Sequence, residues 1–171
     1  MTEILKFLEA HGDALFGLLY RITLREDVAE DLMQELFLRL RAADACRTAR
    51  SPLAYARRTA LHLAFDWRRN RTEVLGVELG DRESSDDGPS PLERLIEVEQ
   101  IQTVLEAMAG LSPRDRELLM MHYIEQQSYE ALAQDFDKTP HQIRALCYKA
   151  LVQLRELLAE ASQRTDRGGH P

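Results

Sequence analysis

The chain has 171 residues, with 29 acidic residues against 22 lysines and arginines, and a net charge of −7. This balance excludes a protein that coats nucleic acid by bulk attraction, so any such contact must come from local basic patches. Cys46 and Cys147 have no metal-binding spacing and are expected to be reduced thiols. Because no stretch resembles a signal peptide or a membrane span, we expect a cytoplasmic protein without a membrane partner.

Residues 3–24 carry apolar side chains at helical spacing and predict one or two amphipathic helices, with a break allowed at Gly12. Residues 26–40 predict the next helix, whose first turn holds Glu26 and Asp27, where acids favour the helix dipole. Its predicted buried side is Val28, Leu32, Leu36, Phe37 and Leu40.

The other side of this second helix is acidic. It consists of Asp27, Glu30, Asp31, Gln34 and Glu35, which are neighbours three and four residues apart. A metal site in a bundle recruits ligands from several helices, often with an E-x-x-H pair, and this segment has no histidine, so we predict no metal here. Two interpretations stay open: a solvated face, and a docking face for a basic partner.

Residues 41–50 predict a positively charged loop, and Ser51-Pro52 starts a helix that continues to Arg71. Between residues 47 and 73 there are seven arginines and two acidic residues, a local charge of +5 in an acidic chain. Arginines interleaved with aromatic rings suit phosphates and unstacked bases. The alternative is that the rings are core and the arginines only solubilise the helix. The candidate DNA-binding residues are Arg47, Arg50, Tyr55, Arg57, Arg58, Trp67, Arg68, Arg69 and Arg71.

Residues 76–91 are rich in glycine, proline, serine and acids and predict a flexible acidic linker. The expected fold is therefore all-α, with one small helical domain over residues 1–75 and a second over residues 92–161. Residues 162–171 are expected to form a frayed tail.

The second domain is predicted to be a four-helix unit. A helix over 92–109 ends at Gly110, and Ser112-Pro113 begins the next one. Ser128 caps a short third helix. Thr139-Pro140 and Gln142 form a capping box at the start of the fourth, whose apolar stripe begins at Ile143.

The last two helices, joined by a tight turn, have the helix-turn-helix pattern, in which the second helix enters the major groove by its N-terminal half. The alternative is a helical hairpin in an ordinary bundle. The outer face of the second helix carries the candidate base- and phosphate-contacting residues His141, Gln142, Arg144, Ala145, Tyr148 and Lys149.

Three stretches, in order, resemble the extracytoplasmic-function (ECF) sigma factors of bacterial RNA polymerase. D-V-A-E-D-L-M-Q-E-L-F-L-R-L resembles the polymerase-docking helix of region 2. The segment from Ser51 to Arg71 resembles the helix that opens and holds the −10 element. L-S-P-R-D-R-E-L-L-M-M-H-Y-I and the helix from Thr139 resemble region 4, which reads the −35 element.

The resemblance implies that the partners are core RNA polymerase and promoter DNA, and commonly an anti-sigma factor as well. It also implies that the protein has no cofactor, no enzymatic activity and no small-molecule substrate. The acidic face would dock on polymerase, and the arginine helix would meet the melted strand. Leu146 and Cys147 depart from the family's reading helix, and no tryptophan follows Leu40. The remaining alternative is a helix-turn-helix regulator with a helical sensing domain.

Overall fold

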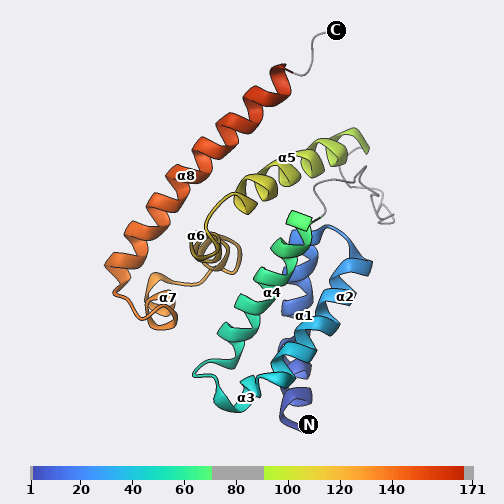
Figure 1. Cartoon of the computed structure of the whole chain (residues 1–171), viewed down its shortest axis with the longest axis vertical. Helices are drawn as coiled ribbons and strands as arrows, with labels where there is room; N and C mark the ends of the chain where they lie inside the picture. Colours follow the sequence, from blue (N-terminus) through green and yellow to red (C-terminus); the bar gives the residue numbers. More distant parts are fainter. Residues whose placement is uncertain (1, 71–90, 168–171) are drawn as a thin grey trace. The chain divides into compact units, whose positions relative to one another are not determined.

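The computed structural model describes residues 2–70 and 91–167, and every regular element in these ranges is a helix (Figure 1). The chain divides into two compact units, residues 1–81 and 82–171. The predicted all-α, two-domain fold is thus confirmed. The predicted linker lies outside the described residues except for Pro91, and so does Arg71. The individual domain limits stay predictions.

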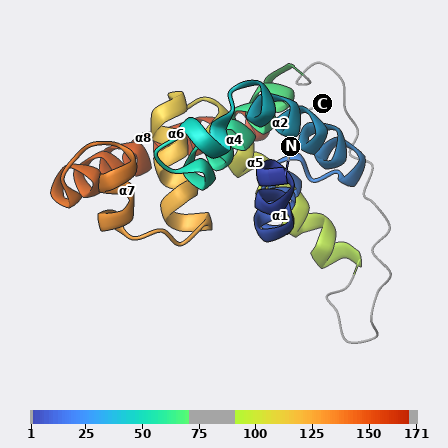
Figure 2. The ribbon, with the colours of Figure 1, turned by 90° about the horizontal axis from the view of Figure 1, so that it is seen from below.

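The first unit is built from three long helices and one short one. Its elements are α1 (Thr2–Thr23), α2 (Glu26–Ala42), α3 (Ala45–Thr48) and α4 (Pro52–Asn70). Each of α1, α2 and α4 packs against the other two, and α3 joins the end of α2 to the start of α4 (Figures 1 and 2). The charged faces of α2 and α4 are therefore held on one small bundle.

Aliphatic side chains at helical spacing form the core of this bundle, which explains why the three helices associate. The largest fully buried members are Leu15, Leu18, Leu19, Ile22, Leu36, Leu40, Leu61 and Phe65. Of the side predicted to be buried on α2, Val28, Leu36 and Leu40 are buried, whereas Leu32 and Phe37 are half-buried. The helix α1 runs through Gly12 without a break.

The second unit contains α5 (Pro91–Ala109), α6 (Pro113–Leu119), the π-helical turn η1 (Met120–Ile124), α7 (Tyr129–Asp135) and α8 (Pro140–Arg167). The helices α5, α6 and α7 all pack against α8. This arrangement is the predicted four-helix unit. Its interior includes Leu118, Leu132, Ile143 and Cys147, each at most 1% exposed.

The predicted caps of the second unit are present. The Asp115 amide donates to Ser112 Oγ at 3.2 Å, and the Ala131 amide donates to Ser128 Oγ at 3.1 Å. At the start of α8 the Gln142 amide donates to Thr139 Oγ1 at 3.2 Å. Caps are local interactions, which is why the sequence predicts them.

The structure differs from the sequence prediction in three places. Residues 45–48 form a helical turn inside the predicted loop, with Ala45 buried against the bundle. The end of the α6 segment widens into a π-helical turn, in which the Glu125 amide donates to the Met120 carbonyl at 3.0 Å. Finally, α8 continues to Arg167, well into the expected tail, because the sequence offers no proline or glycine before Gly168 to stop it.

Candidate nucleic-acid and protein interfaces

The outer face of α8 is open to solvent. All six residues predicted to contact DNA there are exposed, and the Tyr148 side chain is 69% open to solvent. Ile143, Cys147 and Ala150 are buried on the opposite side, against the rest of the unit. The structure therefore presents the candidate reading residues together on one face; their contact with DNA stays a prediction.

Two of these residues differ in how free their side chains are. The Oε1 atom of Gln142 accepts the Thr139 amide at 3.0 Å and so completes the capping box. Reading an adenine through two hydrogen bonds needs both ends of the glutamine amide, so Gln142 would have to use the second lone pair of Oε1 or give up its cap. Arg144 makes no ion pair within the described residues, and its guanidinium lies over the ring of Tyr129, with Cζ 5.1 Å from the centroid.

The residues predicted on and before α4 divide into two groups. Arg47, Arg50, Tyr55 and Arg69 are exposed, whereas Arg57, Arg58, Trp67 and Arg68 are half-buried; Arg71 is outside the described residues. Tyr55 and Arg69 lie on one strip of the helix because fourteen residues make nearly four whole turns. The exposed group is accessible to a nucleic-acid strand, but Arg47 and Arg69 would exchange their present carboxylate partners, Asp44 and Asp66, for phosphate.

Arg68 joins two helices of the first unit, and other arginines of this face are engaged in local ion pairs. The Arg68 Nη1 atom donates to the Ile22 carbonyl oxygen at 3.0 Å, next to the end of α1. This bond satisfies a carbonyl that has no partner inside its own helix, because the last turn of a helix leaves its carbonyls unpaired. Arg69 pairs with Asp66 at 2.7 Å, and Arg47 with Asp44 at 3.9 Å. The basic charge of this face is partly neutralised.

The acidic face of α2 is also divided. Asp27 is paired with Arg25 at 2.6 Å, and Glu35 with Arg39 at 2.8 Å. Glu30, Asp31 and Gln34 are exposed, and within the described residues neither Glu30 nor Asp31 forms an ion pair. The available negative charge is therefore concentrated in the middle of the helix.

An apolar hollow of about 650 Å³ adjoins this acidic face, a feature that the sequence reasoning missed. Its walls come from α1 and α2, with Glu30 and Gln34 among its lining residues; the apolar ones are Leu8, Phe16, Met33, Phe37 and Leu38. Leu38 is 47% exposed. An exposed leucine one helical turn after Gln34 is the signal that could have indicated an apolar contact surface beside the charges.

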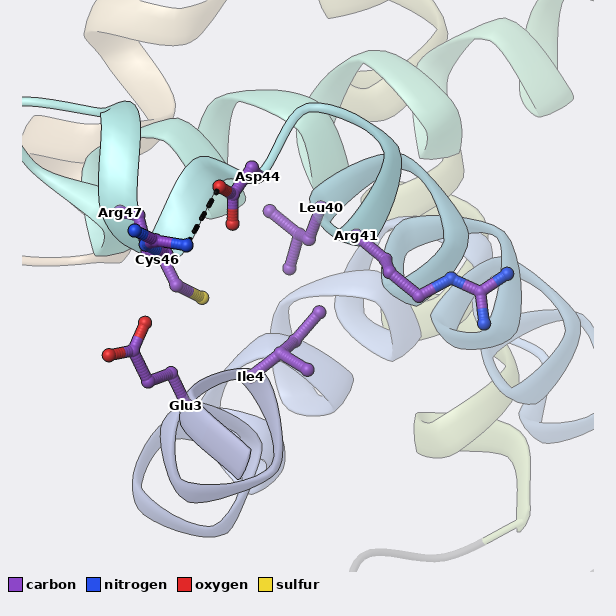
Figure 3. A pocket seen from close by; sticks show the side chains of 7 residues that line it. All are labelled: Glu3, Ile4, Leu40, Arg41, Asp44, Cys46 and Arg47. Atoms are coloured by element: carbon purple, nitrogen blue, oxygen red, sulfur yellow. Dashed lines mark ion pairs between the residues drawn. The ribbon is translucent and has the colours of Figure 1, made fainter. Parts of the chain in front are cut away.

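A second hollow, of about 410 Å³, lies where α3 meets the ends of α1 and α2 (Figure 3). Its lining includes Glu3, Asp44 and Cys46. Burial, and then the carboxylates of Glu3 and Asp44, raise the pKa of the Cys46 thiol. A raised pKa keeps the thiol protonated at neutral pH, so this hollow does not present an activated nucleophile.

Within residues 2–70 and 91–167, no group of three or more histidine, cysteine, aspartate or glutamate side chains is arranged to hold a metal ion. None of the helices in these ranges is long and apolar enough to cross a membrane.

Residues 7–74 match the family of sigma-70 region 2, and residues 101–154 match that of sigma-70 region 4. The two matches together cover more than half of the chain. The first falls on the bundle that carries the α2 and α4 faces, and the second includes the helix-turn-helix and the outer face of α8.

The chain is 32% identical over 158 residues to the probable RNA polymerase sigma factor RfaY of Xanthomonas campestris pv. campestris, a match that covers 88% of this chain. It spans only 39% of the length of that relative. It is also 25% identical over 124 residues to the ferric citrate uptake sigma factor FecI of Escherichia coli K12, and the match covers 72% of each protein.

Among solved structures, the sigma factor RpoE of Bartonella quintana, crystallised in complex with the anti-sigma factor NepR, has a similar fold. The TM-score is 0.52 at 20% identity, over 93% of this chain and 98% of that one. Since region 2 and region 4 follow one another here in the order that the resemblance predicted, and both relatives are sigma factors of the ECF type, the chain belongs to the ECF group of the sigma-70 family.

Proposed function

We propose that this chain binds core RNA polymerase and directs it to promoters, reading a −35 element with α8 and holding a melted −10 element with α4. One observation carries the proposal: the chain combines an open recognition face on α8 with an acidic face on α2 and a basic, aromatic face on α4. A helix-turn-helix regulator would require only α8. The two faces of the first unit would then have no role.

The acidic face supports docking on polymerase through Glu30, Asp31 and Gln34, whose side chains are exposed. Asp27 and Glu35 would contribute only by exchanging their present arginine partners for basic groups of polymerase. The hollow beside them offers apolar contact area as well. A surface that combines desolvated apolar area with complementary charge is typical of a specific protein interface.

Dividing DNA contact between two units fits an acidic chain. Each basic face alone would bind DNA weakly, and holding both on one polymerase makes the second contact effectively intramolecular. Specificity would then appear only in the complex, at the correct spacing of the two promoter elements. The role requires the chain to be in the cytoplasm and requires no catalytic group of its own.

An anti-sigma partner is part of the proposal. Its support is the complex in which the similar RpoE structure was solved. Such a partner would withhold the chain from polymerase until released.

Transcription by purified bacterial core polymerase, on fragmented genomic DNA of the organism that encodes the chain, tests the proposal. Addition of the chain should yield new transcripts with shared upstream sequences. The double variant Glu30→Arg with Asp31→Arg should abolish both co-purification with core polymerase and these transcripts. Its fold should be unchanged, because exposed charges contribute only about 0–1 kcal/mol to stability.

A matched control makes the same change in charge elsewhere. Glu99 and Glu106 are exposed on α5, and Glu99→Arg with Glu106→Arg should leave co-purification intact. Unchanged core binding by the Glu30 and Asp31 variant would contradict the docking assignment. Sequence-specific DNA binding without any stimulation of core polymerase would favour the regulator instead.

A further inference from the structure

One residue of the exposed face of α8, Arg144, contacts a column of aromatic side chains formed by Tyr129, His122 and Tyr123. The Arg144 guanidinium lies over the Tyr129 ring, with 5.1 Å from Cζ to the centroid. The same Tyr129 ring also stacks on the His122 ring, with 4.2 Å between centroids and an interplanar angle of 24°. Tyr123 meets His122 edge-on at 4.7 Å and 75°. The Arg144 guanidinium is therefore in contact with a cluster of three rings, those of Tyr129, His122 and Tyr123.

The column joins three elements of the second unit. Arg144 belongs to α8, Tyr129 begins α7, and His122 comes from the π-helical turn η1. The imidazole is fixed from outside the stack, since its Nδ1 lies 2.8 Å from the Gln127 carbonyl oxygen. A π-helical turn is rare and tends to occur at functional sites. Here the π-helical turn contributes His122, whose ring stacks on the Tyr129 ring.

A cation–π contact differs from an ion pair in which part of the arginine it occupies. A guanidinium that stacks by its flat face on a ring keeps its N–H donors in the plane, pointing outward. An ion pair would occupy those donors, and within the described residues Arg144 has no carboxylate partner. The in-plane donors are those that contact O6 and N7 of a guanine in the major groove.

We propose that Tyr129, supported by His122, is a positioning residue for base reading: it holds the Arg144 guanidinium on edge toward the DNA and thereby sets the selectivity of α8. The inference rests on the proposed function of α8. A long arginine side chain loses rotamer freedom when it binds, and a side chain that is already ordered loses less. Tyr129 would therefore act without touching DNA.

The test uses the full chain with core polymerase and a duplex library randomised across the upstream promoter element. The downstream sequence is fixed to one selected with the wild-type chain. For each variant, the ratio of preferred to other bases at every position is measured. This ratio is insensitive to the fraction of protein that is folded, so it separates positioning from simple loss of stability.

Arg144→Ala should flatten the preference at one position. Tyr129→Leu, which removes the ring, should lower the preference at that same position about two- to five-fold, the size of an exposed cation–π contact. Tyr129→Phe keeps the ring and should remain near wild type. In the Arg144→Ala background, Tyr129→Leu should have no further effect, because the two residues act as one unit.

Two results would overturn the inference, and they differ. If Arg144→Ala loses the preference but Tyr129→Leu keeps it, Tyr129 does not position the arginine, and the proposed function of α8 stands. If Arg144→Ala itself keeps every preference, both the positioning role and the assignment of Arg144 as a reader fail.

Discussion

The two basic helices α4 and α8 were both predicted to contact DNA, but their candidate residues differ in how exposed they are. On α8 all six candidate residues are exposed. Around α4, half of the eight described candidates are half-buried, and Arg68 is bonded to the Ile22 carbonyl. Local positive charge therefore does not measure the charge available to a ligand, because an arginine can be occupied in closing its own fold.

Packing explains the difference. The helix α4 lies against both α1 and α2, so that only a narrow strip of it, including Tyr55 and Arg69, faces solvent. The N-terminal half of α8 is buried along the Ile143 and Cys147 side and leaves a broad face open. An arginine at the edge of a narrow strip reaches backbone carbonyls of its neighbours more easily than one in the middle of a broad face.

The largest expected effect is on stability and falls on α4. Arg68→Ala removes a charged donor from the Ile22 carbonyl and should lower the free energy of unfolding of the first unit by about 1.5–3 kcal/mol. Arg144→Ala, on α8, should change stability by no more than about 0.5 kcal/mol. Chemical denaturation followed by circular dichroism measures both.

Arg69→Ala is the matched control on the same helix. Arg69 pairs with Asp66, one turn away on the same helix, and both side chains are exposed, so the loss of this pair should cost about 0.3–0.5 kcal/mol. Equal destabilisation by Arg68→Ala and Arg69→Ala would remove the distinction between structural and available arginines.

The next effect concerns selectivity and falls on α8. Arg144→Ala should cost about 1–3 kcal/mol at one base pair of the −35 element. Lys149 is more than one turn further along and is expected to meet phosphate. Lys149→Ala should weaken all sequences alike and lower the salt slope by about one unit. Promoter binding by the polymerase complex at several salt concentrations separates the two effects. If both variants lost affinity and selectivity in the same way, the assignment of Arg144 to a base and Lys149 to phosphate would be wrong.

Much of this could be predicted from sequence, for a physical reason. Ser112, Ser128 and Thr139 cap their helices through bonds that span three residues, so the pattern contains them. The apolar stripes likewise predict the helices and most of the core.

The features that could not be predicted are contacts between residues that lie far apart in the sequence or on different helices. The bond from Arg68 to Ile22 joins residues 46 positions apart, and the stack of Arg144 on Tyr129 crosses a turn between two helices. The π-helical turn at Met120 lies in the interior, where Met120 and Met121 are both buried, and no residue pattern in the sequence marks it. Periodicity reports which side of a helix is buried but not which partner meets it.

A smaller effect is expected in promoter melting. Arg50 and Arg69 are exposed candidates in the first unit, and Arg50→Ala with Arg69→Ala should reduce open complexes several-fold while closed complexes form normally. Permanganate reactivity of unpaired thymines reports the open state. Reactivity as strong as with the wild-type chain would indicate that the α4 face is only a solvated surface. Of the two basic helices, α8 alone would then be assigned to DNA contact.

The smallest effect is chemical and uses the one cysteine in each unit. Burial, followed by Glu3 and Asp44, raises the pKa of Cys46, and burial raises the pKa of Cys147. Only the thiolate reacts with iodoacetamide, and a raised pKa lowers the thiolate fraction at a given pH. At about pH 8 both thiols should therefore react more slowly than a free cysteine, with rates that keep rising to higher pH.

Access then separates the two thiols. Cys46 lines the hollow at α3, whereas Cys147 is 1% exposed beneath α8. Timed labelling of the native chain, read by mass spectrometry, should therefore modify Cys46 first and Cys147 only as the second unit opens, and in denaturant the rates should converge. Native labelling of Cys147 as fast as that of Cys46 would mean that α8 is not firmly packed. The broad exposed face of α8, which distinguishes it from α4, would then lack a fixed packing side behind it.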